Sequence, residues 1–160
     1  MFLLFNNYKN IINKILICLL LIIIQGFLPK IMIAENLVIT CDLFFIYLTF
    51  LSLRKDIYPI IILAFLIGLF QDFVIQPETI GLYAFIKVIS VYFLNYLHKV
   101  KTLWTELSKL FYILCIYFFH YFIYHFVFVS DFSYLLVVYT VLESLLNIII
   151  FVLIRKLFIN

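Results

Sequence analysis

Long apolar runs, separated by short polar breaks, occupy most of this chain of 160 residues. A helix that crosses the hydrocarbon core of a bilayer needs about 20 mostly apolar residues. Each run is close to or above that length and is apolar on every face. Barrel strands are shorter, at about 10 residues, and alternate apolar with polar positions. The pattern therefore predicts six transmembrane helices, at approximately 11–28, 37–53, 58–75, 80–97, 103–129 and 134–154.

The composition agrees with a membrane protein. Hydrophobic residues make up 68% of the chain and charged residues 12%, against about 45–50% and about 25% in soluble domains. A soluble fold of this size could not hide so much apolar surface, because small domains leave a large share of their surface exposed. The predicted fold class is all-α: a polytopic integral membrane bundle of six transmembrane helices. Residues 1–160 form a single transmembrane domain in this prediction, with no room for a sizeable soluble one.

Lys and Arg residues recur at alternate breaks between the runs. The four basic groups are Lys9 and Lys14, Arg54 and Lys55, Lys99 and Lys101, and Arg155 and Lys156. Six alternating spans place all four groups on one side, and cytoplasmic loops carry the excess of positive residues. Both termini are therefore predicted to be cytoplasmic. The first run has a basic flank like a signal peptide, but Pro29 and Lys30 follow it instead of a small-residue cleavage site, so we expect a retained anchor.

The remaining charge and cysteine patterns predict no further ligand. The formal net charge of +3 comes without a dense basic patch interleaved with aromatic residues, so nucleic acid is not an expected partner. Cys18, Cys41 and Cys115 lie in apolar runs without the paired spacing of metal or haem sites. The sequence therefore predicts no metal and no other cofactor.

Charged side chains inside the predicted spans are the informative ones, because each costs about 2.5–3.5 kcal/mol to insert at the membrane centre. The main candidates are Asp42, Asp72, Lys87 and Glu143, followed by His120, His125 and Asn147. At about 1.5 Å per residue, Asp42 lies about 7 Å, Asp72 about 5 Å and Lys87 about 10 Å from the outer membrane edge. A lysine stem can extend outward, so we hypothesise an Asp42–Asp72–Lys87 polar cluster. The alternative is that the two carboxylates lie close enough to the interface to be solvated.

The other polar candidates favour structural roles over catalysis. Paired carboxylates suit acid–base chemistry, but no nucleophile, metal motif or phosphate-binding loop accompanies them, so we do not expect an enzyme. His120 and His125 are five residues apart and point in different directions on a helix, which favours hydrogen bonding over metal binding. Glu143 and Asn147 are four apart and share one face, which we expect to point into the bundle.

The scarce glycines mark positions where helices can approach closely. Gly68 and Asp72 are four residues apart and share a helix face. Gly81 and Ala84 form a second patch of small residues at the head of the fourth predicted span. Small residues let helix backbones pack closely in membranes, so we expect close packing beside the Asp72 carboxylate.

The stretch from Asp42 to Val100 resembles the MreD family of bacterial rod-shape-determining proteins. That family has an acidic residue at the head of its second span, a short basic break, a span ending in a Gly-Leu-hydrophobic-x-Asp pattern, and a Gly opening the fourth span. The matching elements here are Asp42-Leu43, Leu53-Arg54-Lys55, Gly68-Leu69-Phe70-Gln71-Asp72 and Ile80-Gly81-Leu82-Tyr83-Ala84. Total length, six-span layout and basic C-terminal end also agree. The family often has Pro before the first acidic residue, where this chain has Cys41.

The resemblance implies a non-enzymatic scaffold of the cell-wall elongation complex in the bacterial inner (cytoplasmic) membrane. Such a scaffold is needed for rod shape and for regulated peptidoglycan synthesis. The implied partners are an MreC-like single-span protein, an MreB-like filament, a RodA-like polymerase and a penicillin-binding transpeptidase. We further hypothesise that a groove containing Gly68, Asp72 and Gly81 receives the transmembrane helix of the MreC-like partner.

Two other function classes fit parts of the pattern. Six short helices with almost no loops also resemble the substrate-binding membrane subunit of energy-coupling-factor transporters, where an outward polar cluster would suit a ligand pocket. The outer breaks, however, offer few polar residues to close over a ligand. An intramembrane enzyme is the third class, and it lacks a nucleophile–base pair or metal spacing. Likeness of fold alone does not decide between such functions.

Overall fold

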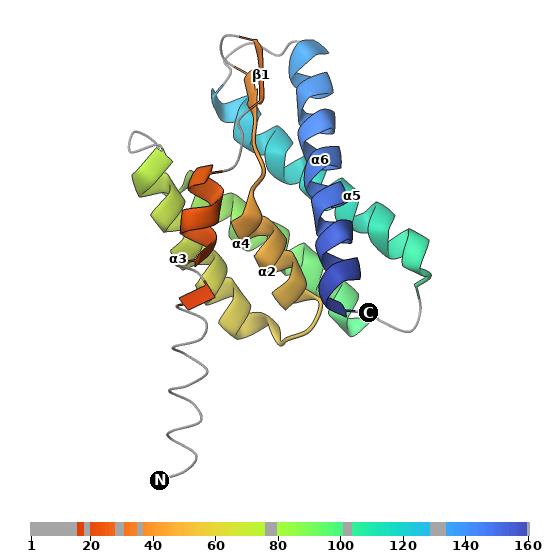
Figure 1. The fold of residues 1–160 in the computed structure, drawn as a ribbon. Helices are drawn as coiled ribbons and strands as arrows, with labels where there is room; N and C mark the ends of the chain where they lie inside the picture. The colour runs from red at the N-terminus through yellow and green to blue at the C-terminus, as the bar shows by residue number, and fades with distance from the viewer. Residues whose placement is uncertain are drawn as a thin grey trace.

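The computed structural model describes residues 16–17, 20–27, 31–34, 37–75, 80–100, 104–128 and 134–159, and most of them are helical (Figure 1). Within the first predicted span, residues 16–17 and 20–27 are helical, and its other residues lie outside the described part of the chain. The elements that follow are β1 (Ile31–Ala34), β2 (Leu37–Ile39), α2 (Leu43–Ser52), α3 (Ile57–Ile75), α4 (Leu82–Lys99), α5 (Glu106–Phe128) and α6 (Tyr134–Ile159). Helices α3 to α6 correspond to the last four predicted runs.

Three helices of the described chain, α3, α5 and α6, are long and apolar enough to cross a membrane. With 19 residues, α3 extends about 28 Å at about 1.5 Å per residue, close to the roughly 30 Å hydrocarbon core of a bilayer. Large apolar side chains such as Phe65, Phe85 and Ile149 are exposed on the outside of the bundle. An outer surface of this kind suits contact with lipid.

The predicted all-α fold class is confirmed, since helices make up the bundle and the described strands add only one short hairpin, but the prediction of one continuous helix over 37–53 is wrong. Strands β1 and β2 form an antiparallel hairpin with Ile31 paired to Ile39, and α2 begins only at Leu43. Both the strand and the short helix are apolar, so hydrophobicity alone could not separate them. Asp42 provides the physical reason for the late start, because its carboxylate caps the first turn of α2.

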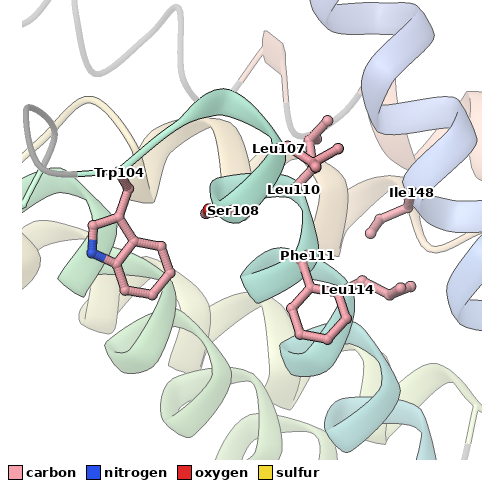
Figure 2. Close-up of a pocket in the computed structure, with 7 residues that line it drawn as sticks. All are labelled: Trp104, Leu107, Ser108, Leu110, Phe111, Leu114 and Ile148. Atoms are coloured by element: carbon pink, nitrogen blue, oxygen red, sulfur yellow. The ribbon is translucent and has the colours of Figure 1, made fainter.

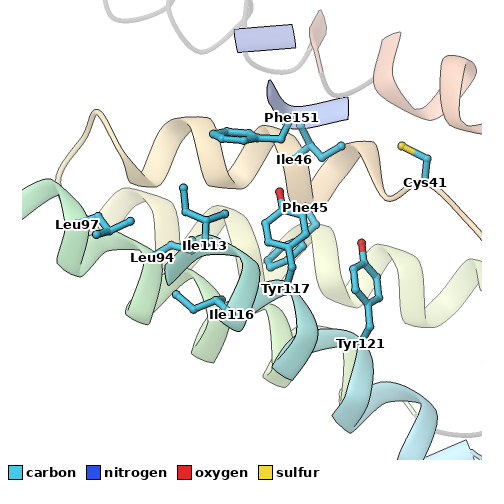
Figure 3. Packing of buried hydrophobic residues seen from close by; sticks show 10 residues of the cluster. All are labelled: Cys41, Phe45, Ile46, Leu94, Leu97, Ile113, Ile116, Tyr117, Tyr121 and Phe151. Carbon is cyan, nitrogen blue, oxygen red and sulfur yellow. The ribbon is translucent and has the colours of Figure 1, made fainter. Parts of the chain in front are cut away.

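The helices pack in a chain of neighbours around a shared apolar core. Antiparallel α3 and α4 lie side by side, α4 also contacts α2 and α5, and α5 crosses α6 (Figure 1). Figure 3 shows side chains of α2, α4, α5 and α6 converging in one cluster. Its buried members are Cys41, Phe45, Ile46, Leu94, Leu97, Ile113, Ile116, Tyr117, Tyr121 and Phe151.

Several helix ends that carry basic residues meet at one end of the bundle, which we call the basic end. The Asn95 amide nitrogen donates to the carbonyl oxygens of Ser52 and Lys55, both at 2.9 Å, and so ties the end of α4 to the turn between α2 and α3. The Arg155 guanidinium near the end of α6 pairs with Glu106, the first residue of α5, at 2.6 Å. The rings of Phe50 on α2 and Phe151 on α6 pack in a tilted arrangement with 4.7 Å between their centroids, which brings these two ends together.

Candidate functional site: a buried polar cluster

Asp42 is the N-cap residue of α2 and binds partners with both of its carboxylate oxygens. Its Oδ1 accepts a hydrogen bond from the backbone N–H of Phe45 at 3.0 Å, which satisfies one of the unpaired donors at the start of the helix. Its Oδ2 forms an ion pair with the Lys87 ammonium of α4. A carboxylate is also favoured here because a helix N-terminus carries partial positive charge. Asp42 therefore both starts α2 and joins it to α4.

Lys87 is completely buried, with an exposed fraction of 0%. Besides Asp42, its ammonium lies 5.3 Å from the ring centroid of Phe45 and 5.6 Å from that of Tyr83, within the range of cation–π attraction. An unpaired ammonium in such surroundings would be strongly unfavourable. The Lys87 side chain is thus held by an opposite charge and two aromatic faces inside the bundle.

Asp72, near the end of α3, binds the N-terminus of α4. Its Oδ2 accepts from the N–H groups of Gly81 at 3.0 Å and Ala84 at 3.2 Å, and its Oδ1 accepts from Tyr83 at 2.9 Å. The first N–H groups of a helix have no partner within it, and Gly81 at the N-cap has no side chain to supply one. Gly81 adopts a φ of +103°, a conformation that glycine tolerates best. Asp72 therefore caps α4 from the neighbouring helix.

Among the described glycines, Gly68 is the one at which α3 and α4 approach each other most closely. A Cβ atom built on Gly68 would lie 2.3 Å from the Ala84 Cα and 2.6 Å from its backbone nitrogen. The face shared by Gly68 and Asp72 is thus filled by α4 of the same chain. This corrects the hypothesis that a groove at Gly68 receives a partner's transmembrane helix.

Glu143 and Asn147 of α6 bind the extended segment that leads into α2. The Glu143 Oε1 accepts from the Thr40 N–H at 3.3 Å and from its hydroxyl at 3.1 Å. The Asn147 Oδ1 accepts from the Asp42 N–H at 2.9 Å, and its amide donates to the Thr40 carbonyl at 3.2 Å. Non-helical backbone within a membrane must find such partners in the protein. The two side chains expected to face the interior therefore satisfy the break before α2.

The two histidines of α5 extend the network on different sides. His125 lies 2.7 Å from the second carboxylate oxygen of Glu143. His120 contacts the Ser90 hydroxyl at 3.1 Å through Nδ1 and stacks on Phe45 with 4.0 Å between ring centroids. Among the residues that the structure describes, no group of three His, Cys, Asp or Glu side chains is arranged to hold a metal ion.

We define the polar cluster as Asp42, Lys87, His125, Glu143 and Asn147, which are linked by hydrogen bonds and ion pairs, together with Asp72, which binds the start of α4. The hypothesis from sequence grouped Asp42, Asp72 and Lys87, and the structure brings Asp42 and Lys87 into direct contact while Asp72 binds backbone N–H groups. Sequence reasoning missed Thr40, because its role depends on a backbone break that the apolar run conceals. It also missed Gln71, whose amide lies 3.5 Å from Asp42 Oδ1 and whose only signal was its place beside Asp72.

Chemically, each carboxylate of the cluster is bound and fixed by partners within the chain. Asp42 is matched by an ammonium, Asp72 by three N–H groups, and Glu143 by Thr40 and His125. These contacts join the start of α2 to α3, α4, α5 and α6.

No family model, curated protein or solved structure matches the chain.

Proposed function

We propose that this chain is a non-enzymatic membrane scaffold of a bacterial cell-wall elongation complex, with the role that its resemblance to MreD implies. The observation that carries the proposal is that the polar cluster binds the helices of this chain to one another. The Asp42–Lys87 ion pair is buried between α2 and α4, and the Asp42 backbone is bound to Asn147 of α6. Interactions of this kind hold membrane helices together in fixed positions. A bundle locked in this way is suited to positioning partner proteins.

In this proposal the chain crosses the inner membrane six times and both termini are cytoplasmic. Support comes from the basic end, where the turn containing Arg54 and Lys55 lies close to the ends of α4 and α6. An excess of Lys and Arg marks the cytoplasmic side of a membrane protein. The α2 segment, with 10 residues or about 15 Å of helix, covers about half the membrane. The bound extended segment before it completes that crossing.

The partners proposed are an MreC-like protein, an MreB-like filament, a RodA-like polymerase and a penicillin-binding transpeptidase. The MreC-like protein would bind by helix packing against an outer face of the bundle. Gly68 is not available for that contact, because the Ala84 backbone fills the space beside it. Exposed apolar side chains of the other helix faces, such as Phe65 on α3 and Phe85 on α4, are available instead.

Isolation of the protein from its native membrane under mild crosslinking, followed by identification of the bound proteins, tests the proposal. The scaffold function predicts an MreC-like protein together with cell-wall synthases. Co-isolation of a pair of cytoplasmic ATPases with a coupling subunit would contradict it and identify a transporter subunit. If an MreC-like protein is found, a photo-crosslinking residue placed singly at Phe65 or at Phe85 shows which helix face it covers. The same residue at buried Ile113 is the control and should give no adduct with the partner.

A further inference from the structure

A groove lies between the first turns of α5 and the middle of α6, near the basic end of the bundle (Figure 2). We call it the α5–α6 groove; its volume is about 550 Å³ and its lining residues are Trp104, Leu107, Ser108, Leu110, Phe111, Leu114 and Ile148. The lining is apolar apart from Ser108, whose hydroxyl is already bound to the Thr105 hydroxyl at 2.8 Å. The groove therefore suits an apolar occupant.

Positive side chains lie where α5 begins and α6 ends, and both bind Glu106, the residue before Leu107 of the groove. Glu106 binds Lys109 at 2.9 Å with one carboxylate oxygen and Arg155 at 2.6 Å with the other. Two cations on one carboxylate leave an excess of one positive charge, and both cations retain exposed surface. The indole of Trp104 at the same end is of the type found at membrane interfaces. An apolar groove thus ends beside an unbalanced positive charge.

We propose that the α5–α6 groove binds an acyl chain of an anionic phospholipid whose phosphate lies against Lys109 and Arg155. Basic pockets between transmembrane helices on the cytoplasmic side are known to bind anionic headgroups, and the basic end is the side that would face the cytoplasm. The charge beside the groove distinguishes this lipid from a zwitterionic one. The inference depends on location in a membrane and is independent of the proposed cell-wall function.

The chain offers a built-in reporter for this site, because Trp104 is its single tryptophan. The full chain would be reconstituted in vesicles of phosphatidylcholine with a fixed minor fraction of lipid carrying brominated acyl chains, which quench tryptophan at short range. Brominated phosphatidylglycerol should quench Trp104 severalfold more than the same fraction of brominated phosphatidylcholine. Equal quenching by the two lipids would overturn the proposal, as would quenching by neither, which would indicate a protein seated in the groove.

Charge-removing variants identify the headgroup contact. Arg155→Gln and Lys109→Gln should each lower the preference for phosphatidylglycerol by up to roughly fivefold, the attraction that one Lys or Arg contributes near an anionic surface. Lys55→Gln removes the same charge from the turn between α2 and α3 and should leave the preference unchanged. An equal loss in all three variants would mean general charge attraction only and would overturn the site. Unchanged quenching by brominated phosphatidylcholine would show that the groove itself is intact in each variant.

Discussion

Single residues of the polar cluster show how charge can be tolerated inside an apolar bundle. Asp42, Asp72 and Lys87 are each more than nine-tenths buried, and each has its partner within the chain. The sequence could single them out, because any charge within a long apolar run is expensive and needs an explanation. It could not assign their partners, because these depend on which helices lie side by side.

The ion pair between Asp42 and Lys87 predicts strong coupling between the two residues. Asp42→Asn removes the charge but keeps a good N-cap residue, and Lys87→Met keeps the length of the side chain. Each single variant should lower the free energy of unfolding by about 3–5 kcal/mol, because it leaves the other charge buried without a partner. The double variant should lose clearly less than the sum. Unfolding in mild detergent measures all four proteins, and additive losses would show that the two residues do not interact.

The role of Asp72 as the cap of α4 predicts that the stability of the chain falls in steps as the carboxylate oxygens are removed. Asp72→Asn keeps one acceptor oxygen for the N–H groups of Gly81, Tyr83 and Ala84, whereas Asp72→Leu keeps none. Each buried donor left unpaired costs about 1–3 kcal/mol, so the leucine variant should be the less stable of the two. The midpoints of thermal unfolding provide the comparison. If the leucine variant matched the parent chain, the role of Asp72 as the cap of α4 would be refuted.

At the scale of elements, apolar length predicted α3, α4, α5 and α6 well, because each helix buries one side and leaves apolar residues on the other. It failed at 37–53, where a strand, an extended link and a ten-residue helix share one apolar run. The signal available there was Thr40-Cys41-Asp42, a polar interruption ending in a strong N-cap residue. The binding of that link by Glu143 and Asn147, more than 100 residues later in the chain, had no local signal.

The contact between α3 and α4 predicts that Gly68 tolerates no side chain. Gly68→Ala places a Cβ atom 2.3 Å from the Ala84 backbone and should force the helices apart, at a cost of about 1–3 kcal/mol or more, as for other overpacked sites. Gly26→Ala is the matched control, because no atom lies within 4 Å of the Cβ that it adds. Thermal unfolding should separate the two variants. Equal stability of both would mean that the close approach at Gly68 does not contribute to the fold.

At the scale of the whole molecule, polarity is arranged inside out relative to a soluble protein. Charged residues of the polar cluster are buried, while aromatic and aliphatic side chains such as Phe73 and Leu153 are exposed. The basic end of the bundle lies opposite the hairpin and the start of α6 (Figure 1). Composition predicted the environment of the chain, whereas the grouping of its polar side chains became visible only in three dimensions.

The proposed topology makes a prediction for intact cells. A single cysteine would be placed at Lys55, in the turn at the basic end, or at Tyr134, the exposed first residue of α6, in a chain without other accessible cysteines. A thiol reagent that cannot cross the inner membrane should label Tyr134→Cys from outside that membrane and should label Lys55→Cys only after the membrane is opened. The reverse pattern would invert the proposed orientation.

The scaffold proposal is tested most directly by the length-to-width ratio of the source cells while this chain is depleted. If the chain organises cell-wall elongation, the ratio should fall as cells widen and round, and expression of the parent chain should restore it. A ratio that stays constant through complete depletion would contradict the proposal.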